Sequence, residues 1–486
     1  MTHALRPVLF AAAAAAALAG CAVGPDYRRP ELGLNHAFHT AAPAAAAAPA
    51  TDMTRWWDSF GDPALTRVVE RAEAQNLDLA QARARVLQSR AAAKAAGAAL
   101  LPTASAQAGI TDVQQSLLSP IGAVARGLPG FERDYDDYDL GASASWEIDL
   151  FGGLRRGREA ARADAAASRD LADAVRVSVA AEAADAYLQV RAYQARLDAA
   201  RGQERVDQDL VGLVSRRADE GVSSERELHQ AQAELEAVRA TAPPLLSGLA
   251  AELNRLDVLM GAQPGTYQAE LLAAAPIPAA PAVAGADGPA GLLRRRPDVA
   301  AAEQRLIAAN ARIGEAVADY YPKVSISGLL GVESLDSSQV FAGEAVSHQI
   351  GAGLRWRLFD FGRVDAEVAG ARGRDAEALA AWRAAVLGAA EEVEDAFADL
   401  GQQQARADAL SRQIEALTLA RAQAEQAYEN GAISLIEVRD ADRQLLSASD
   451  QLAQARAGAA RAAVACFRAL GGGWKAPPAP LRVARS

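Results

Sequence analysis

Cys21 is the residue of this sequence best placed for a specific chemical modification. It follows an apolar run over residues 8–18 and the small pair Ala19-Gly20, which is the pattern of a secretory signal and its cleavage site. Leu-Ala-Gly-Cys matches the bacterial lipobox, so we expect residues 1–20 to be a signal peptide and Cys21 to carry a covalent lipid. Each buried methylene of such a lipid adds about 0.8 kcal/mol to membrane binding. The alternative is ordinary cleavage beside a stray cysteine.

The rest of the sequence offers little for catalysis or metal binding. Five histidines and the second cysteine, Cys466, lack the spacing of a metal site, and we expect Cys466 to be a small buried residue on a helix. No nucleophile elbow or phosphate loop occurs, and the acidic run Glu391, Glu392, Glu394, Asp395 is typical of a solvated helix face. We therefore expect neither an enzyme nor a bound cofactor. The formal charge of −11 disfavours nucleic acid as a partner.

The sequence contains an internal repeat. Residues recur at a spacing of 356 − 146 = 210: Trp146 and Trp356, Phe151-Gly152 and Phe361-Gly362, Gly221 and Gly431, Glu227 and Glu437. Around Pro102 and Pro322 the spacing is 322 − 102 = 220. Such register indicates a duplication. We expect a lipidated N-terminal tether over residues 21–64, a first repeat over 65–261, a linker over 262–291, a second repeat over 292–470 and a C-terminal tail over 471–486.

Each repeat holds two segments in which apolar and polar residues alternate. We predict strands over about 103–113, 138–150, 322–333 and 347–359, close to the length of a tilted membrane-spanning strand. Charges keep to one face and little chain remains to cover the other, which favours a membrane barrel over a soluble sheet with one solvated face. Membrane barrels begin at about eight strands and tolerate no open edge in lipid. The chain must therefore oligomerise, and three copies would supply twelve strands.

A long helix follows the second strand of each repeat. The stretch from Gly362 to Tyr428 lacks proline, and a helix of about 67 residues spans roughly 100 Å. Apolar residues at steps of three and four indicate a coiled-coil seam. We expect helix hairpins over about 153–260 and 361–470, with a kink at Pro243-Pro244 in the first. A single helix over 65–100 is expected to stack end to end on the first returning helix.

These features resemble the outer-membrane efflux factors of the TolC and OprM type, in the NodT-like lipoprotein branch. The matching segments cover nearly the whole chain and include LAGC followed by GPDY, WWDSFGDPAL, LLRRRPDVAAAEQRLIAANARIGEA, WRLFDFGR and YENGAISLIEV. The resemblance implies a mainly α chain with a membrane β-barrel. In the expected homotrimer, a twelve-strand barrel in the outer membrane is continued by a long periplasmic α-helical coiled-coil barrel.

The resemblance also implies a function, a location and partners. The expected function is the exit duct of a tripartite pump that exports drugs or other small molecules, lipid-anchored in the bacterial outer membrane with a large periplasmic portion. A periplasmic adaptor (membrane fusion) protein and an inner-membrane RND-type transporter are the expected partners. Two alternatives stay open, namely an exit duct for type I protein secretion and a structural coiled-coil lipoprotein without a channel.

The resemblance places the functional residues at the hairpin tips. Gly221 and Gly431 are implied as the tips that dock the adaptor, and the implied aperture gate comprises Glu227, Tyr428, Ile436, Glu437 and Asp440. Three copies of Glu437 or Asp440 around an axis would form a carboxylate ring, which favours cations. Some family members carry an arginine where Ile433 stands, so we expect no salt-bridge latch at that position. The alternative for each acid is a solvated helix face.

Overall fold

The computed structural model describes residues 22–33, 35, 37–40, 52–283, 289, 291 and 295–475. The expected signal peptide, Cys21 and residues 476–486 of the tail lie outside the described residues. The chain divides into two compact units. One comprises Met1–Pro30, Leu87–Ala166 and Gln304–Ala380, and the other comprises Glu31–Val86, Ala167–Glu303 and Ala381–Ser486.

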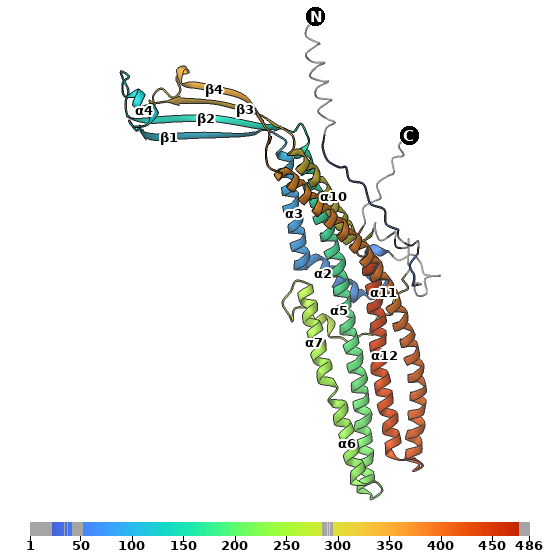
Figure 1. The fold of residues 1–486 in the computed structure, drawn as a ribbon. Helices are drawn as coiled ribbons and strands as arrows, with labels where there is room; N and C mark the ends of the chain where they lie inside the picture. The colour runs from blue at the N-terminus through green and yellow to red at the C-terminus, as the bar shows by residue number, and fades with distance from the viewer. Residues whose placement is uncertain are drawn as a thin grey trace. The chain divides into compact units, whose positions relative to one another are not determined.

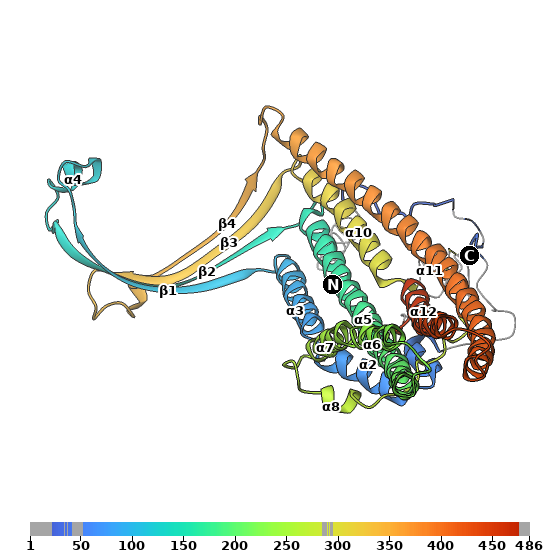
Figure 2. The ribbon, with the colours of Figure 1, turned by 90° about the horizontal axis from the view of Figure 1, so that it is seen from below.

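The first unit contains an antiparallel sheet with the strand order β1-β2-β3-β4 (Figures 1 and 2). The strands are β1 (Thr103–Gln114), β2 (Asp134–Ile148), β3 (Lys323–Ser334) and β4 (Val346–Arg355). Trp146 lies opposite Ile326 and Ser145 lies opposite Ser327. The predicted apolar and polar faces therefore each continue from strand to strand. Short helices α4 (Pro120–Ala125) and η3 (Gly343–Ala345) lie in the two outer loops.

Strand β4 ends at Arg355, so the predicted end at residue 359 was wrong. Arg355 lies opposite Lys323, which directly follows Pro322, and proline has no backbone N–H to continue the ladder. The indole Nε1 of Trp356 instead donates to the carbonyl of Tyr320 at 2.9 Å. Strand β2 begins before the predicted residue 138 because β1 continues alongside it as far as Gln114.

The two long helices have the same length and the predicted spacing. Helix α5 (Gly153–Asp219) and helix α11 (Arg363–Glu429) each contain 67 residues. In the second unit, α6 (Glu225–Arg239) and α7 (Ala242–Leu259) return beside α5, and α12 (Leu435–Ala469) returns beside α11 (Figures 1 and 2). The break between α6 and α7 puts Pro243 in the first turn of α7, where no N–H is needed. No such break occurs in α12.

The prediction of a single helix over residues 65–100 was wrong, because Asn76 separates α2 (Pro63–Gln75) from α3 (Leu77–Ala98). The Oδ1 of Asn76 accepts the N–H groups of Asp78 and Leu79 at 2.9 and 3.0 Å and so caps α3. Its Nδ2 donates to the carbonyl of Leu259, at the end of α7, at 3.0 Å. The end of α7 is therefore joined to the start of α3.

An equivalent joint occurs in the second repeat. Arg296 precedes α10 (Pro297–Ala318), and its Nη1 donates to the carbonyl of Ala469, at the end of α12, at 3.3 Å. Arg296 is equivalent to Asn76 at the spacing of 220, and Ala469 is equivalent to Leu259 at the spacing of 210. The same two positions are therefore joined in both repeats. An amide fills this position in one repeat and a guanidinium in the other.

Aromatic residues and alanines form the core of the second unit. Trp56, in η2 (Met53–Phe60), is 1% exposed and stacks on Phe467 with the ring centroids 5.2 Å apart. Small buried alanines line much of α12, which lets its backbone approach its neighbours closely. A short helix, α8 (Gln268–Leu271), lies in the predicted linker. None of the helices among the described residues has the length and apolar character needed to cross a bilayer.

Candidate aperture and hairpin tips

Both hairpins turn through the same backbone arrangement. Gly221 and Gly431 have φ of +74° and +72°, in the left-handed region that favours glycine at the end of a helix. The N–H of Val222 donates to the carbonyl of Arg217 at 2.8 Å, and the N–H of Ala432 donates to the carbonyl of Ala427 at 2.9 Å. These bonds close the last turns of α5 and α11, so both glycines lie at the hairpin tips.

Glu227 and Glu437 each belong to a capping box at the start of a returning helix. Glu227 Oε2 accepts the N–H of Ser224 at 3.1 Å, and Glu437 Oε1 accepts the N–H of Ser434 at 3.3 Å. These bonds satisfy N–H groups that otherwise lack partners at a helix start. This role was not predicted, although serine followed three residues later by glutamate is its known signal.

Tyr428 is buried, 6% exposed, beside Val214, Leu435 and Val438. Its hydroxyl makes no hydrogen bond among the described residues. The guanidinium of Arg217 lies 4.8 Å from its ring centroid, within the range of a cation–π contact. Because Arg217 comes from the last turn of α5, this contact ties the first hairpin to the second. It was not predicted from the sequence.

The other predicted gate residues lie on the exposed side of α12. Ile436 is 54% exposed, and the carboxylate of Asp440 pairs with Arg443 one turn further along. Ile433 packs with the apolar residues around Tyr428. The structure therefore brings Ile436, Glu437 and Asp440 together and separates them from the buried Tyr428 ring.

A partly buried group of polar and charged residues joins the two hairpins about two helical turns from the start of α12. We call it the polar cluster: Gln203 and Asp207 on α5, Glu234 on α6, Arg421 and Glu425 on α11, Arg439 and Asp442 on α12. Arg439 Nη2 lies 2.6 Å from Glu234 Oε2, and Arg421 Nε lies 2.9 Å from Asp442 Oδ1. The Arg439 contact links α12 directly to α6.

Two carboxyl groups of the polar cluster are nearly inaccessible to water. Asp207 and Asp442 are 3% and 4% exposed, and Oδ2 of each has no hydrogen-bond partner among the described residues. Burial raises the pKa of both carboxyls. The negative charges of Asp442 and Glu234 raise the pKa of Asp207 further, against the opposing hydrogen bond from Gln203 and the charge of Arg439. The negative charges of Glu425 and Glu234 likewise raise the pKa of Asp442, whereas the hydrogen bond and the charge of Arg421 lower it.

Two members of the acidic run that was predicted to be solvated make contacts that were not predicted, although Glu392 is exposed. Glu392 Oε2 accepts Arg296 Nη1 at 2.6 Å. The Glu394 carboxylate accepts the N–H groups of His39 and Thr40 at 2.5 and 2.7 Å. A helix-face pattern could not show this, because the partners come from distant segments.

Comparison with known proteins identifies similar chains over nearly the full length. The outer membrane efflux protein family matches residues 68–262 and 289–472. The pyoverdine export outer membrane protein OpmQ of Pseudomonas putida is 34% identical over 448 residues, which cover 92% of this chain and 94% of OpmQ. Nodulation protein T of Rhizobium leguminosarum bv. viciae is 29% identical over 460 residues, 95% of this chain and 92% of that protein. The solved outer-membrane channel OprN is 35% identical with a TM-score of 0.83, covering 93% of this chain and 100% of that one.

Proposed function

The chain belongs to the outer membrane efflux protein family, and we propose that it works as the exit duct of a tripartite pump. The predicted function of an outer-membrane efflux channel is confirmed, and so is a mainly α fold with an antiparallel sheet like that of the solved channel OprN. The trimer and the internal duplication stay predictions. The proposed partners are a periplasmic adaptor and an inner-membrane RND-type transporter. The proposed cargo is small organic molecules, which is supported by the name of OpmQ, a pyoverdine exporter.

We further propose that the duct is a homotrimer, because the sheet has two open edges. Among the described residues, the order β1-β2-β3-β4 leaves one side of β1 and one side of β4 unpaired. An open edge is not tolerated in lipid. Pairing β4 of one copy with β1 of the next, three times around a ring, removes every edge and gives a twelve-strand barrel.

The internal repeat specifies how the two edges pair. Strands β2 and β3 pair so that residue numbers sum to 146 + 326 = 472. In the internal repeat, β2 is equivalent to β4 at a spacing of +210, and β3 is equivalent to β1 at a spacing of −220. If β4 and β1 pair as β2 and β3 do, the residue numbers of each β4–β1 pair sum to 472 + 210 − 220 = 462. Leu354 then lies opposite Ala108 of the next copy, and Ala352 lies opposite its Ile110. Apolar residues stay beside apolar residues in this register, which supports it.

Side chains outside the strands support the same arrangement. Phe151 stacks on Tyr321 within the chain, with ring centroids 4.5 Å apart. The equivalent positions are Phe361 and Leu101, and both are exposed, at 103% and 64%. In the proposed trimer, Phe361 of one copy would pack on Leu101 of the next and both would be buried.

Disulfide formation tests the trimer and its register. The pair Leu354→Cys with Ala108→Cys should link three copies into a covalent ring on a non-reducing gel, because directly opposed residues suit disulfide geometry. Leu354→Cys with Ile110→Cys is the matched control, since diagonal neighbours lie roughly 7–8 Å apart. Preferential linking of the control pair would refute the register, and no linking by either pair would refute the β4–β1 contact.

Conductance and drug susceptibility test the duct. Purified protein in a planar bilayer should conduct ions, whereas a coiled-coil lipoprotein without a channel would not. Deletion of the gene should increase susceptibility to some compounds in a panel of antibiotics, dyes and detergents. Unchanged susceptibility throughout, together with loss of a secreted protein from the medium, would favour type I secretion instead.

We propose that the hairpin tips form the inner aperture and the adaptor-docking surface. Tyr428 with Arg217 would hold the two hairpins together, and Ile436, Glu437 and Asp440 would face the passage. The capping glutamates, Glu227 and Glu437, would keep the tips in shape. The double variant Tyr428→Ala with Asp440→Asn should raise conductance or vancomycin uptake, and no change in either would remove these residues from the gate.

A further inference from the structure

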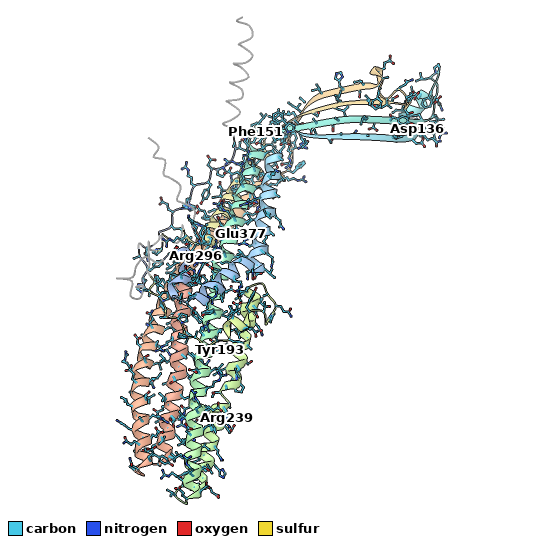
Figure 3. The ribbon with its side chains drawn as sticks, turned by 180° about the vertical axis from the view of Figure 1, so that it is seen from behind. Asp136, Phe151, Tyr193, Arg239, Arg296 and Glu377 are labelled. Carbon is cyan, nitrogen blue, oxygen red and sulfur yellow. The ribbon has the colours of Figure 1, made fainter. Side chains whose placement is uncertain are left out.

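The two hairpins of the chain lie side by side within the second unit. In Figures 1 and 2, α5 lies next to α12, and the flanks of this row of helices are α6 with α7 on one side and α11 on the other. Figure 3 shows the same row from behind, with Arg239 at the end of α6 on one flank. We call the contact between the first and second hairpins of one chain the within-copy seam.

Three ion pairs cross the within-copy seam, each between a residue of α12 and a residue of the first hairpin. The charged atoms lie 2.6 Å apart in every pair: Arg439 with Glu234, Asp450 with Arg196, and Arg461 with Asp185. The three α12 residues follow one another at intervals of 450 − 439 = 11 and 461 − 450 = 11, about three helical turns, so they lie on one face of the helix. At the tip, the contact between Arg217 and the ring of Tyr428 adds a fourth tie.

The internal repeat predicts which residues meet between copies. In the proposed trimer, α11 of one copy lies beside α6 and α7 of the next, because these helices form the flanks of the row. The two hairpins are equivalent at the spacing of 210, so each within-copy contact has an equivalent between copies. We call the contact between the second hairpin of one copy and the first hairpin of the next the between-copy seam.

Each of the four ties loses at least one partner in the between-copy seam. The positions equivalent to Arg439 and Glu234 hold His229 and Gln444, which are exposed in the single chain and cannot form an ion pair because glutamine is neutral. The other three equivalent pairs each contain alanine: Ala240 with Arg406, Ala251 with Asp395, and Ala218 with Ala427. At these positions the charged ties are therefore confined to the within-copy seam.

The apolar packing at the tip differs between the seams in the same direction. Within the chain, the ring of Tyr428 packs in a cluster with Leu213, Ile433 and Leu435. The equivalent positions hold small or polar residues: Ala218, Gln423, Ser223 and Glu225. Stabilisation by apolar contact scales with the apolar area removed from water, so these positions stabilise the between-copy seam less.

We propose that the aperture opens at the between-copy seams, while the two hairpins of each copy stay joined and move as one unit. A seam that parts must expose its side chains to water. Small and neutral polar side chains are exposed at lower cost than apolar rings or paired charges, because little apolar area and no ion pair is lost. This proposal rests on the proposed trimeric duct with its aperture at the hairpin tips.

Moving a tie from one seam to the other tests the cause. The double variant His229→Arg with Gln444→Glu recreates, between copies, the ion pair that Arg439 and Glu234 form within a copy. In a planar bilayer it should conduct less than the wild type at the same salt concentration, and the difference should shrink at high salt, which screens exposed charges. His229→Arg with Gln444→Lys, which places like charges there, is the matched control. Equal conductance of the two variants at low salt would overturn the proposed role of the missing charges.

Chemical crosslinking at two equivalent pairs of positions tests which seam moves. Glu234→Cys with Arg439→Cys spans the within-copy seam, and His229→Cys with Gln444→Cys spans the between-copy seam at the same level. A short bis-methanethiosulfonate would bridge each pair in the purified full-length protein through disulfides that a reducing agent can cleave. On a denaturing gel, the first pair should stay a single chain and the second should form a covalent trimer. Treated wild type is the control for the native cysteines.

The conductance of the same samples decides between the seams. Bridging His229→Cys with Gln444→Cys should remove most of the conductance of the untreated variant, and reduction should restore it, whereas bridging Glu234→Cys with Arg439→Cys should change it little. An equal effect at both pairs, a larger loss at the within-copy pair, or no covalent trimer from the between-copy pair would overturn the proposal. A wild type that never conducts would instead refute the proposed duct, and this proposal with it.

Discussion

Asp207→Asn should stabilise the contact between the two hairpins at neutral pH. Asp207 is 3% exposed, and one of its carboxylate oxygens has no partner in the part of the chain that the structure describes. Two of its neighbours are the acids Asp442 and Glu234. Asparagine keeps the size and the acceptor for Gln203 but removes the charge that burial and the two acids disfavour. We therefore expect the variant to raise the free energy of local opening at neutral pH by about 1.36 kcal/mol for each unit by which the pKa of Asp207 is raised.

The gain should depend on pH in a defined direction. The pKa of Asp207 is raised in the folded state, so the folded protein binds this proton more tightly than the unfolded chain. The contribution of Asp207 to the free energy of unfolding is therefore fully present below the ordinary pKa of an aspartate. It is lost as the pH rises through the raised pKa, and the loss is about 1.36 kcal/mol for each unit by which folding raises that pKa. The advantage of Asp207→Asn should accordingly be present at pH 8 and shrink towards pH 4.

Hydrogen exchange measures this effect at the cluster itself. The amides of residues 200–210 and 436–446 would be followed at several pH values and corrected for the intrinsic exchange rates. Asp209→Asn, an exposed position on the same helix, is the matched control and should change nothing. Faster exchange in Asp207→Asn at pH 8, or an effect that is the same at every pH, would show that the charge of Asp207 does not destabilise this contact.

Three further predictions concern the tips, the joint and the core. Gly431→Ala and Gly221→Ala should each destabilise their hairpin by roughly 1–2 kcal/mol in chemical unfolding, because alanine disfavours the left-handed conformation; no loss would contradict the turn geometry. Arg296→Ala should destabilise the second unit by about 1–3 kcal/mol, since Asp298, Glu392 and the carbonyl of Ala469 lose their donor, and Arg296→Lys should recover part of this loss. Burial raises the pKa of the Cys466 thiol to about 12, so a thiol reagent at pH 8 should modify it only after unfolding; reaction at the rate of free cysteine would contradict its burial.

The elements with strong periodic patterns were predictable from the sequence. Alternation defined the strands because charged side chains cannot occupy the lipid-facing positions, and the constant spacing between repeats defined the long helices. The ends of elements were less predictable. Strand β4 stops where Pro322 removes a donor on the partner strand, and Asn76 divides a helix that local propensity alone would continue.

The positions of the site residues at the hairpin tips were predictable from the sequence, but their contacts were not. The tip glycines follow from the turn sequence, whereas the burial of Tyr428 and its contact with Arg217 depend on two hairpins packing together. The polar cluster draws residues from four helices, and in the sequence each of them looks like an ordinary solvated polar residue on a helix face. The contacts of Glu392 and Glu394 were missed for the same reason, since a single helix face gives no sign of distant partners.

The interruption between α6 and α7 makes the two hairpins mechanically unequal. The returning arm of the first hairpin has a break at Ala240 and Thr241, whereas α12 continues for 35 residues. A bending force applied at the first tip can be absorbed at the break, but the same force at the second tip is transmitted along α12 to the joint at Arg296. The second hairpin is thus the stiffer arm, and a push from an adaptor would travel furthest through it.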